Sequence, residues 1–182
     1  MDSPDRILQH GTERPFPQFG QRNIGAATSK LIAASIGDIV TVFSRSPAHK
    51  DFSLADIEWM VLPSVLNGQF YVAEFAHKET GFHATIAVVT WAFGSEEVDR
   101  RICDNPSRSI RLRPEEWESG GAAWIVDLVG DPRGIAGAVE WLNADPFKER
   151  NANIAVRDAT GVVQALTINR LRLSPSHTQG QA

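Results

Sequence analysis

The sequence contains very little cysteine and no long apolar run. Of its 182 residues only Cys103 is a cysteine, so an intrachain disulfide and a CxxC metal site are both excluded. No apolar run approaches the length that crosses a membrane, and the N-terminus lacks the basic-then-apolar pattern of a secretory signal. These absences predict a protein without a membrane span that works in the reducing cytoplasm.

The chain also lacks an excess of positive charge. Its formal net charge is -4 at pH 7, which argues against general nucleic-acid binding, because such binding draws most of its affinity from neutralising phosphates. The arginines are nevertheless unevenly spread: between Arg100 and Arg113 five arginines stand against one acid, Asp104. This basic stretch either meets an acidic partner or is simply a solvated helix end and loop.

Metal-binding signals are absent as well. No two of the five histidines have the i, i+4 spacing of a helical zinc site, so no metal is expected. His10 and His177 fall in the predicted flexible ends, and His77 and His83 flank a predicted hairpin turn, where solvent exposure is expected. The remaining histidine is His49.

Length and periodicity predict one domain with flexible ends. A chain of this size can bury a core large enough to fold without disulfides or bound metal ions. Residues 1–22 mix prolines and glycines with alternating charges and show no periodicity, which predicts a flexible leader. Residues 23–173 are predicted to form a single domain, and residues 174–182 a polar, flexible tail.

The hydrophobic pattern predicts helices packed on a sheet. Apolar residues recur at helical spacing from Ile24 to Phe43, and this helix ends before Pro47. Ser53 resembles the cap of a second helix, which Pro63 kinks or breaks. The further predicted elements are strands over 70–75 and 85–93, a helix over 95–103, a helical turn at 114–117, a strand over 122–129, a helix containing Ile135, Val139 and Leu142, and a hairpin of 153–157 and 162–168. The order indicates an α+β fold, with a mixed, largely antiparallel sheet and flanking helices.

A histidine and an aspartate stand on separate predicted elements. His49 follows the turn Ser46-Pro47-Ala48, and Asp127 ends the apolar run Trp124-Ile125-Val126. Histidine suits general base catalysis because its unperturbed pKa lies near ambient pH, and a carboxylate that accepts one ring N–H fixes the tautomer. Taken alone, the pair has an ordinary interpretation: a surface histidine at a helix approach and an aspartate that caps a turn.

An ordered set of motifs surrounds this pair. The motifs are Ser46-Pro47-Ala48-His49, Ile57-Glu58-Trp59-Met60-Val61-Leu62-Pro63, Gln69-Phe70, Val89-Thr90-Trp91-Ala92, Glu116-Trp117-Glu118-Ser119-Gly120 and Trp124-Ile125-Val126-Asp127. In this order, over residues 36–158, the chain resembles the toxin-activating lysine acyltransferases, bacterial enzymes that fatty-acylate RTX protoxins.

The resemblance implies that His49 and Asp127 form a catalytic pair. It implies an acetyltransferase-like (GNAT-related) fold and no tightly bound cofactor, with acyl-acyl carrier protein and its phosphopantetheine thioester as co-substrate. The acceptor would be an internal lysine of an RTX-type protein, and family dimers imply a homodimer. A base is needed for this chemistry, because a free lysine near its pKa of about 10.4 is almost wholly protonated at neutral pH.

Four further residues are candidates for substrate binding. Ser46 belongs to the site motif, where its hydroxyl would orient a substrate, and a Ser-Pro step also simply makes a turn. Trp91 is a candidate for lining an acyl-chain channel, and a core position is an equally good interpretation. Arg111 and Arg113 are candidates for docking the acidic carrier protein. Cys103 is a conceivable thioester nucleophile, but a half-buried structural residue is expected there.

The segment after Asp131 bears on the acyl donor. Acetyltransferases that bind CoA carry an Arg/Gln-x-x-Gly-x-Gly/Ala loop here, and counted from Arg133, Ala136 falls where glycine is needed. This departure disfavours CoA and agrees with the family's use of acyl-acyl carrier protein. Two alternatives stay open: an acyl-CoA-dependent N-acyltransferase of a small amine, and a non-catalytic adaptor for a secreted RTX partner. Direct transfer and a covalent acyl-enzyme are both open too.

Overall fold

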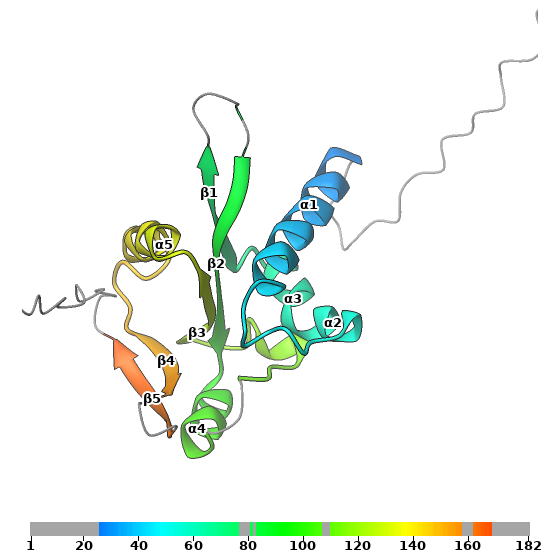
Figure 1. The fold of residues 1–182 in the computed structure, drawn as a ribbon. Coiled ribbons are helices and arrows are strands. Elements are labelled where there is room, and N and C mark those ends of the chain that lie inside the picture. The colour runs from blue at the N-terminus through cyan, green and yellow to red at the C-terminus, as the bar shows by residue number, and fades with distance from the viewer. Residues whose placement is uncertain (1–25, 77–80, 82, 107–109, 158–161, 169–182) are drawn as a thin grey trace, which may run out of the picture.

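A five-stranded sheet with helices on both faces is the frame of the structure (Figure 1). The computed structural model describes residues 26–76, 81, 83–106, 110–157 and 162–168. The predicted flexible leader (residues 1–22) and tail (residues 174–182) lie outside the described residues. They therefore stay predictions.

Helices and strands follow one another along the chain largely as predicted. The helical elements are α1 (Ala26–Phe43), η1 (Leu54–Asp56), α2 (Ile57–Met60), α3 (Leu62–Leu66), α4 (Glu96–Asp104), η2 (Pro114–Glu116) and α5 (Pro132–Ala144). The strands are β1 (Phe70–Ala76), β2 (His83–Gly94), β3 (Ala122–Gly130), β4 (Ala152–Arg157) and β5 (Val163–Ile168). All the predicted strands are confirmed, and their ends differ from the prediction by at most two residues.

The sheet is mostly antiparallel, with one parallel contact. The strand order is β1-β2-β3-β4-β5, and only β3 and β4 run parallel among these neighbours. Their pairing is short, from Ala123↔Ala152 to Ile125↔Ile154, and α5 supplies the crossover that a parallel pair requires. The predicted α+β class is confirmed, and the arrangement is consistent with an acetyltransferase-like fold.

Separate cores lie on the two faces of the sheet. Helix α5 covers one face, and α1, α2 and α3 cover the other (Figure 1). The core under α5 contains Val89, Trp91, Ala123, Ile125, Ala138, Val139, Leu142, Phe147 and Ala152. The core under α1 contains Ile39, Val42, Phe43, Met60, Val61, Val65 and Val88. Neighbouring residues of β2, Val88 and Val89, thus point to opposite faces, as the pleat of a strand requires.

The helix predicted from Ser53 is divided into η1, α2 and α3. Ser53 begins it as expected, because its backbone N–H and its hydroxyl each donate to Asp56 Oδ2 at 2.8 Å. The helix is interrupted at Val61, where φ is -107°. Pro63 has no N–H to continue the ladder of α2 and is tolerated only in the first turn of α3. The expected break is confirmed, two residues before the proline.

Helix α5 approaches the sheet closely at Gly134. A Cβ added there would lie 2.7 Å from the Cβ of Ala87 and 3.2 Å from the Cβ of Ala73. A Cβ added at Gly137, on the same helix, meets nothing within 4 Å. The two glycines therefore differ in packing but share the same intrinsic helix propensity.

We expect Gly134→Ala to lower the free energy of unfolding by about 1–3 kcal/mol, because overpacking at the sheet outweighs the gain in helix propensity. The matched control Gly137→Ala should raise it by about 0.5–1 kcal/mol. Urea denaturation of both variants measures the difference. Equal stabilisation by both substitutions would show that α5 does not sit tightly on the sheet at Gly134.

Candidate active site

His49 lies in the turn after α1 and is buried against two aromatic rings. Its backbone N–H donates to the Ser46 carbonyl at 3.0 Å and closes the turn that Pro47 stiffens. The imidazole stacks on Phe43, with ring centroids 4.3 Å apart, and meets Phe52 edge-on at 5.2 Å. The side chain is 6% exposed. The ordinary interpretation as a surface histidine is therefore wrong.

Asp127 reaches the imidazole because β3 contains a β-bulge. Trp91 of β2 pairs with Ile125, but its neighbour Thr90 pairs with Asp127, so Val126 has no residue opposite. Ile125 packs toward α5, and strict alternation would turn Asp127 toward α5 as well. The extra residue reverses the phase and turns Asp127 to the α1 face, where the imidazole lies.

Ser46, His49 and Asp127 form a continuous line of hydrogen bonds. His49 Nε2 lies 2.9 Å from Asp127 Oδ1, and His49 Nδ1 lies 3.0 Å from Ser46 Oγ. Because a carboxylate only accepts, the neutral imidazole donates its Nε2–H to Asp127, and Nδ1 accepts from the Ser46 hydroxyl. The order of hydroxyl, imidazole and carboxylate is the one that activates a hydroxyl or an incoming nucleophile. His49 and Asp127, which are 78 positions apart in the sequence, are thus in direct contact.

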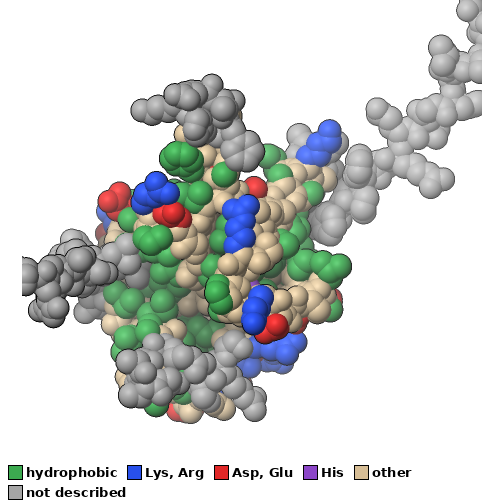
Figure 2. All heavy atoms as spheres, in the orientation of Figure 1, with side chains coloured by type: hydrophobic (Ala, Val, Ile, Leu, Met, Phe, Trp, Pro, Cys, Tyr) green, Lys and Arg blue, Asp and Glu red, His purple; other side chains and the backbone are tan. Residues whose placement is uncertain are grey.

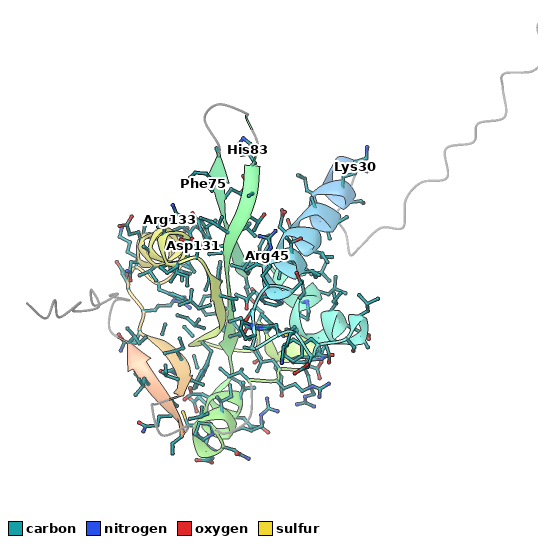
Figure 3. The ribbon with its side chains drawn as sticks, viewed as in Figure 1. Lys30, Arg45, Phe75, His83, Asp131 and Arg133 are labelled. Atoms are coloured by element: carbon teal, nitrogen blue, oxygen red, sulfur yellow. The ribbon has the colours of Figure 1, made fainter. Side chains whose placement is uncertain are left out.

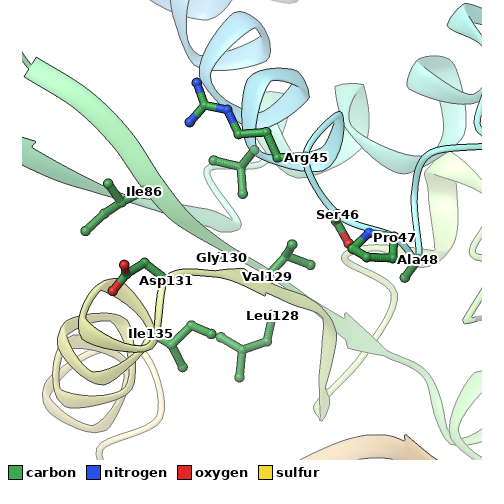
Figure 4. A pocket seen from close by; sticks show the side chains of 11 residues that line it. Arg45, Ser46, Pro47, Ala48, Ile86, Leu128, Val129, Gly130, Asp131 and Ile135 are labelled. Carbon is green, nitrogen blue, oxygen red and sulfur yellow. The ribbon is translucent and has the colours of Figure 1, made fainter.

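Two cavities flank the turn that carries His49. The larger, of about 610 Å³, is lined by Val42, Arg45, Ser46, Pro47, Ala48, Ile86, Leu128, Val129, Gly130, Asp131 and Ile135 (Figure 4). The smaller, of about 250 Å³, is lined by Val40, Phe43, Ser44, His49, Lys50, Phe52, Ser53, Leu54, Ile57, Met60 and Val61. Ser46 therefore opens to the larger cavity, and the imidazole forms part of the wall of the smaller one.

Trp91 lies on the opposite face of the sheet from this site. It is 3% exposed and belongs to the core under α5. Its ring centroid lies 5.5 Å from that of Trp141 and 6.2 Å from that of Phe147. The structure does not bring Trp91 to His49 and Asp127, and its position is that of a core tryptophan.

Of the two candidate arginines, Arg111 is linked to the site through aromatic side chains. Its Cζ stands 4.6 Å from the centroid of the Trp59 ring, and that ring meets Phe52 edge-on at 6.3 Å. Since Phe52 also contacts the imidazole, two aromatic rings connect Arg111 with His49. The guanidinium therefore stands on the same side of the molecule as the smaller cavity.

Arg113 is held by Glu116, a buried acid that the sequence analysis missed. Glu116 is 5% exposed and accepts from Arg101 at 2.7 Å and from Arg113 at 2.8 Å. Burial acts to raise the pKa of Glu116, but the hydrogen bonds from Arg113 and Arg101 lower it. Two arginines of the basic stretch thus balance an internal charge. The available signal was an acid three residues after the helix-start position of Arg113.

Cys103 is exposed, which corrects the expectation of a half-buried residue. Val98 and Ile102, four residues apart on α4, face the core, and Cys103 lies about 100° further round the helix. Partial desolvation and the neighbouring Asp99 raise the pKa of the Cys103 thiol. Both effects disfavour the thiolate that nucleophilic attack requires.

The described part of the chain offers neither a metal cluster nor a membrane-spanning helix. It holds no group of three or more His, Cys, Asp or Glu side chains suited to a metal ion. Across these same residues, no helix is both long and apolar enough to cross a membrane. Proton-transfer geometry is found at Ser46, His49 and Asp127.

A family model agrees with the resemblance carried by the motifs. The model of the RTX toxin acyltransferase family matches residues 30–170. The chain belongs to this family. His49 and Asp127 both lie within the matched range.

Named relatives match a shorter part of this acyltransferase-family chain. The leukotoxin-activating lysine-acyltransferase LktC of Pasteurella haemolytica-like sp. (strain 5943B) is 30% identical over 94 residues, which are 52% of each chain. The lysine-acyltransferase RtxC of Vibrio cholerae is 26% identical over 102 residues, 56% of this chain and 61% of the relative. The RTX-II toxin-activating lysine-acyltransferase ApxIIC of Actinobacillus pleuropneumoniae is 26% identical over 94 residues, 52% of this chain and 53% of the relative. The chain thus spans between half and two thirds of these relatives' length.

In this member of the RTX toxin acyltransferase family, α5 begins beside the larger cavity with a charged cap. Asp131 Oδ1 accepts from the backbone N–H of Arg133 at 2.9 Å, and the Arg133 guanidinium donates to both carboxylate oxygens at 3.0 Å. The hydrogen bonds from Arg133 lower the pKa of Asp131 from its ordinary 3.8 to about 2. The carboxylate of Asp131 therefore already occupies the anion-binding position at the start of α5.

Asp131 predicts a pH-dependent contribution to stability. A carboxyl whose pKa is lower in the folded chain stabilises the fold above its unfolded pKa, and this contribution is lost as the pH falls from about 4 to about 2. Asp131→Asn keeps a good helix cap but removes the charge. Over that pH range the free energy of unfolding should fall less steeply for the variant than for the wild type. Parallel acid-denaturation curves would contradict the ion pair.

Proposed function

We propose that the chain is a protein-lysine acyltransferase that moves a fatty acyl group from acyl-acyl carrier protein to an internal lysine of an RTX-type protoxin. The observation that carries the proposal is the 2.9 Å hydrogen bond between His49 Nε2 and Asp127 Oδ1, in a chain of the RTX toxin acyltransferase family. Two relatives are named as toxin-activating lysine-acyltransferases, which supports the choice of acceptor.

In the proposed reaction His49 is the general base. At pH 7 only about one lysine side chain in 2,500 is neutral, so the amine must lose a proton to attack. The amine nitrogen forms a bond to the thioester carbonyl carbon, the C–S bond breaks, and the proton passes through His49 to the departing thiolate. Asp127 holds the Nε2–H and stabilises the imidazolium formed on the way.

Ser46 stands between the larger cavity and the base. The imidazole is 6% exposed and its Nδ1 is already engaged by Ser46 Oγ at 3.0 Å. A substrate in the larger cavity therefore meets the hydroxyl before the ring. In the proposal, Ser46 accepts the amine proton while it donates its own proton to Nδ1, so that no net charge stays on the serine.

The start of α5 supports a carrier protein over CoA as the donor. Acetyltransferases that use CoA place its diphosphate on backbone N–H groups at a helix start. Here the Asp131 carboxylate accepts one of those N–H groups and takes the neighbouring Arg133 as its partner. A diphosphate would meet like charge, whereas the arm of a carrier protein brings one phosphate. A homodimer and a cytoplasmic location stay predictions from the sequence.

Mass spectrometry of an RTX protein co-expressed with this chain tests the proposed function. We expect a lysine carrying a fatty acyl group with the wild type, and a rate of acylation lower by on the order of 10²–10⁴-fold with His49→Ala. Asp127→Asn should lower kcat and leave KM unchanged, because the carboxylate acts on the ring and not on the substrate.

The matched control is His83→Ala, which removes an exposed histidine paired only with Glu74 among the described side chains. It should acylate at the wild-type rate. If no lysine of the RTX protein is acylated in the presence of the wild-type chain, the proposed acyltransferase activity is wrong. Full toxin activation by His49→Ala would instead favour a non-catalytic adaptor.

Ser46→Ala tests how the proton reaches His49. The variant keeps the base and the carboxylate, so kcat should fall about five- to tenfold, the value of one hydrogen bond, with KM unchanged. Single-turnover acyl transfer by purified chain and acyl carrier protein measures this. A loss as large as that of His49→Ala, together with a labelled acyl ester on Ser46 in wild type, would replace the direct route with a covalent acyl-enzyme.

A further inference from the structure

The larger cavity lies along the part of β3 that no longer pairs with β4 but still pairs with β2. The pairing of β3 with β4 stops at Ile125↔Ile154, and the cavity is lined by the part of β3 that follows, from Leu128 to Gly130. Its walls come from both faces of the sheet, since Val42 belongs to the α1 side and Ile135 to the α5 side (Figure 4). The floor is apolar and leads to Ser46.

Two charged side chains line this cavity, and only one of them is neutralised. Asp131 is paired with Arg133 on its own helix start. Arg45, two residues after the end of α1, makes one long hydrogen bond, from Nη1 to the Thr85 carbonyl at 3.5 Å. Among the described residues no carboxylate lies within 4.0 Å of its guanidinium. The hydroxyl of Thr85 donates to Asp38 Oδ1 at 3.0 Å.

Arg45 stands apart from the other cations on its face of the molecule. Figure 2 shows the Lys and Arg side chains of this face in several groups, two of them close together beside acidic side chains, and no single basic surface covers the face. Figure 3 places Arg45 at the end of α1 and the Asp131–Arg133 pair across from it on α5, with Lys30 at the far end of α1. A ligand in the cavity therefore meets one free positive charge, on the α1 side.

An apolar floor beneath one unpaired guanidinium fits an amphipathic ligand with a single anionic group. We propose that Arg45 binds the phosphate of the donor's phosphopantetheine arm and so determines specificity for a phosphorylated donor. This inference rests on the proposed function, which brings such an arm to Ser46. The phosphate is bound from the α1 side, because Asp131 occupies the helix start that would otherwise attract it.

The chemistry of the two groups supports the assignment. A guanidinium presents a planar set of N–H donors that matches two phosphate oxygens, and an ionic hydrogen bond of this kind is stronger than a neutral one. The exposed Arg45 gives up only a long bond to a carbonyl when it turns to a phosphate. The phosphate takes no part in the bonds that form and break, so its contact with Arg45 affects donor binding and not the chemical step.

Direct binding tests the inference without turnover. Octanoyl-4′-phosphopantetheine and octanoyl-pantetheine, which differ only by the phosphate, are titrated into the full chain by calorimetry. We expect the wild type to prefer the phosphorylated probe by about tenfold. Arg45→Gln should abolish this preference, Arg45→Lys should keep part of it, and the control Lys30→Gln should not change it.

Kinetics with octanoyl-acyl carrier protein gives the second readout. Arg45→Gln should raise KM about tenfold and leave kcat unchanged, and added salt should raise the wild-type KM toward that of the variant. Equal binding of the two probes by wild type, no detectable binding of either, or the same change with Lys30→Gln would overturn the inference.

The two proposals fail separately. If the chain acylates no lysine but the phosphate preference disappears in Arg45→Gln, the proposed function is wrong and the binding site stands. If octanoyl-CoA binds more tightly than the carrier protein and depends on Arg45, the phosphate site stands and the donor is CoA.

Discussion

The unpaired residue in β3 sets the direction of Asp127, and the hydrogen bond to His49 depends on it. Up to Ile125 the strand alternates normally, with Ile125 under α5. Val126 then has no partner on β2, and from Asp127 onward the phase is reversed, so Val129 packs under α1. Because bulges are local and rigidly paired on both sides, the carboxylate is aimed by backbone geometry and not by a flexible side chain.

The imidazole is fixed just as firmly from the other side. Phe43 stacks on it and both ring nitrogens are bonded, so its tautomer and orientation are set before a substrate arrives. The same burial restricts access, since the ring is 6% exposed. His49 itself lines only the smaller cavity, and Ser46 is the member of the hydrogen-bonded line that reaches the larger one. In the proposed mechanism, positioning the base and connecting it to a substrate in the larger cavity are thus tasks of different residues.

Much of this could be predicted from the sequence, and the exceptions share a cause. Strands and helix ends follow from local patterns, and the motif order was enough to single out His49 and Asp127. The bulge at Val126 could not be predicted from the sequence. In an uninterrupted apolar run, no alternation of polar and apolar residues shows which face of the sheet each side chain occupies. Burial of His49 and of Glu116 was also missed, since each polar group is satisfied by residues that only folding brings together. The pattern of one face of α4 would have shown Cys103 to be exposed.

The charge at the start of α5 connects stability with the proposed choice of acyl donor. An acidic cap stabilises a helix by satisfying a free N–H and by opposing the positive end of the dipole. That same positive end is what an acetyltransferase uses to hold a diphosphate. A chain that fills the position with Asp131 strengthens its helix and gives up this anion site. A donor with one phosphate can be held by a single cation elsewhere along the cavity, and Arg45 is the cation that the fold leaves unpaired there among the described residues.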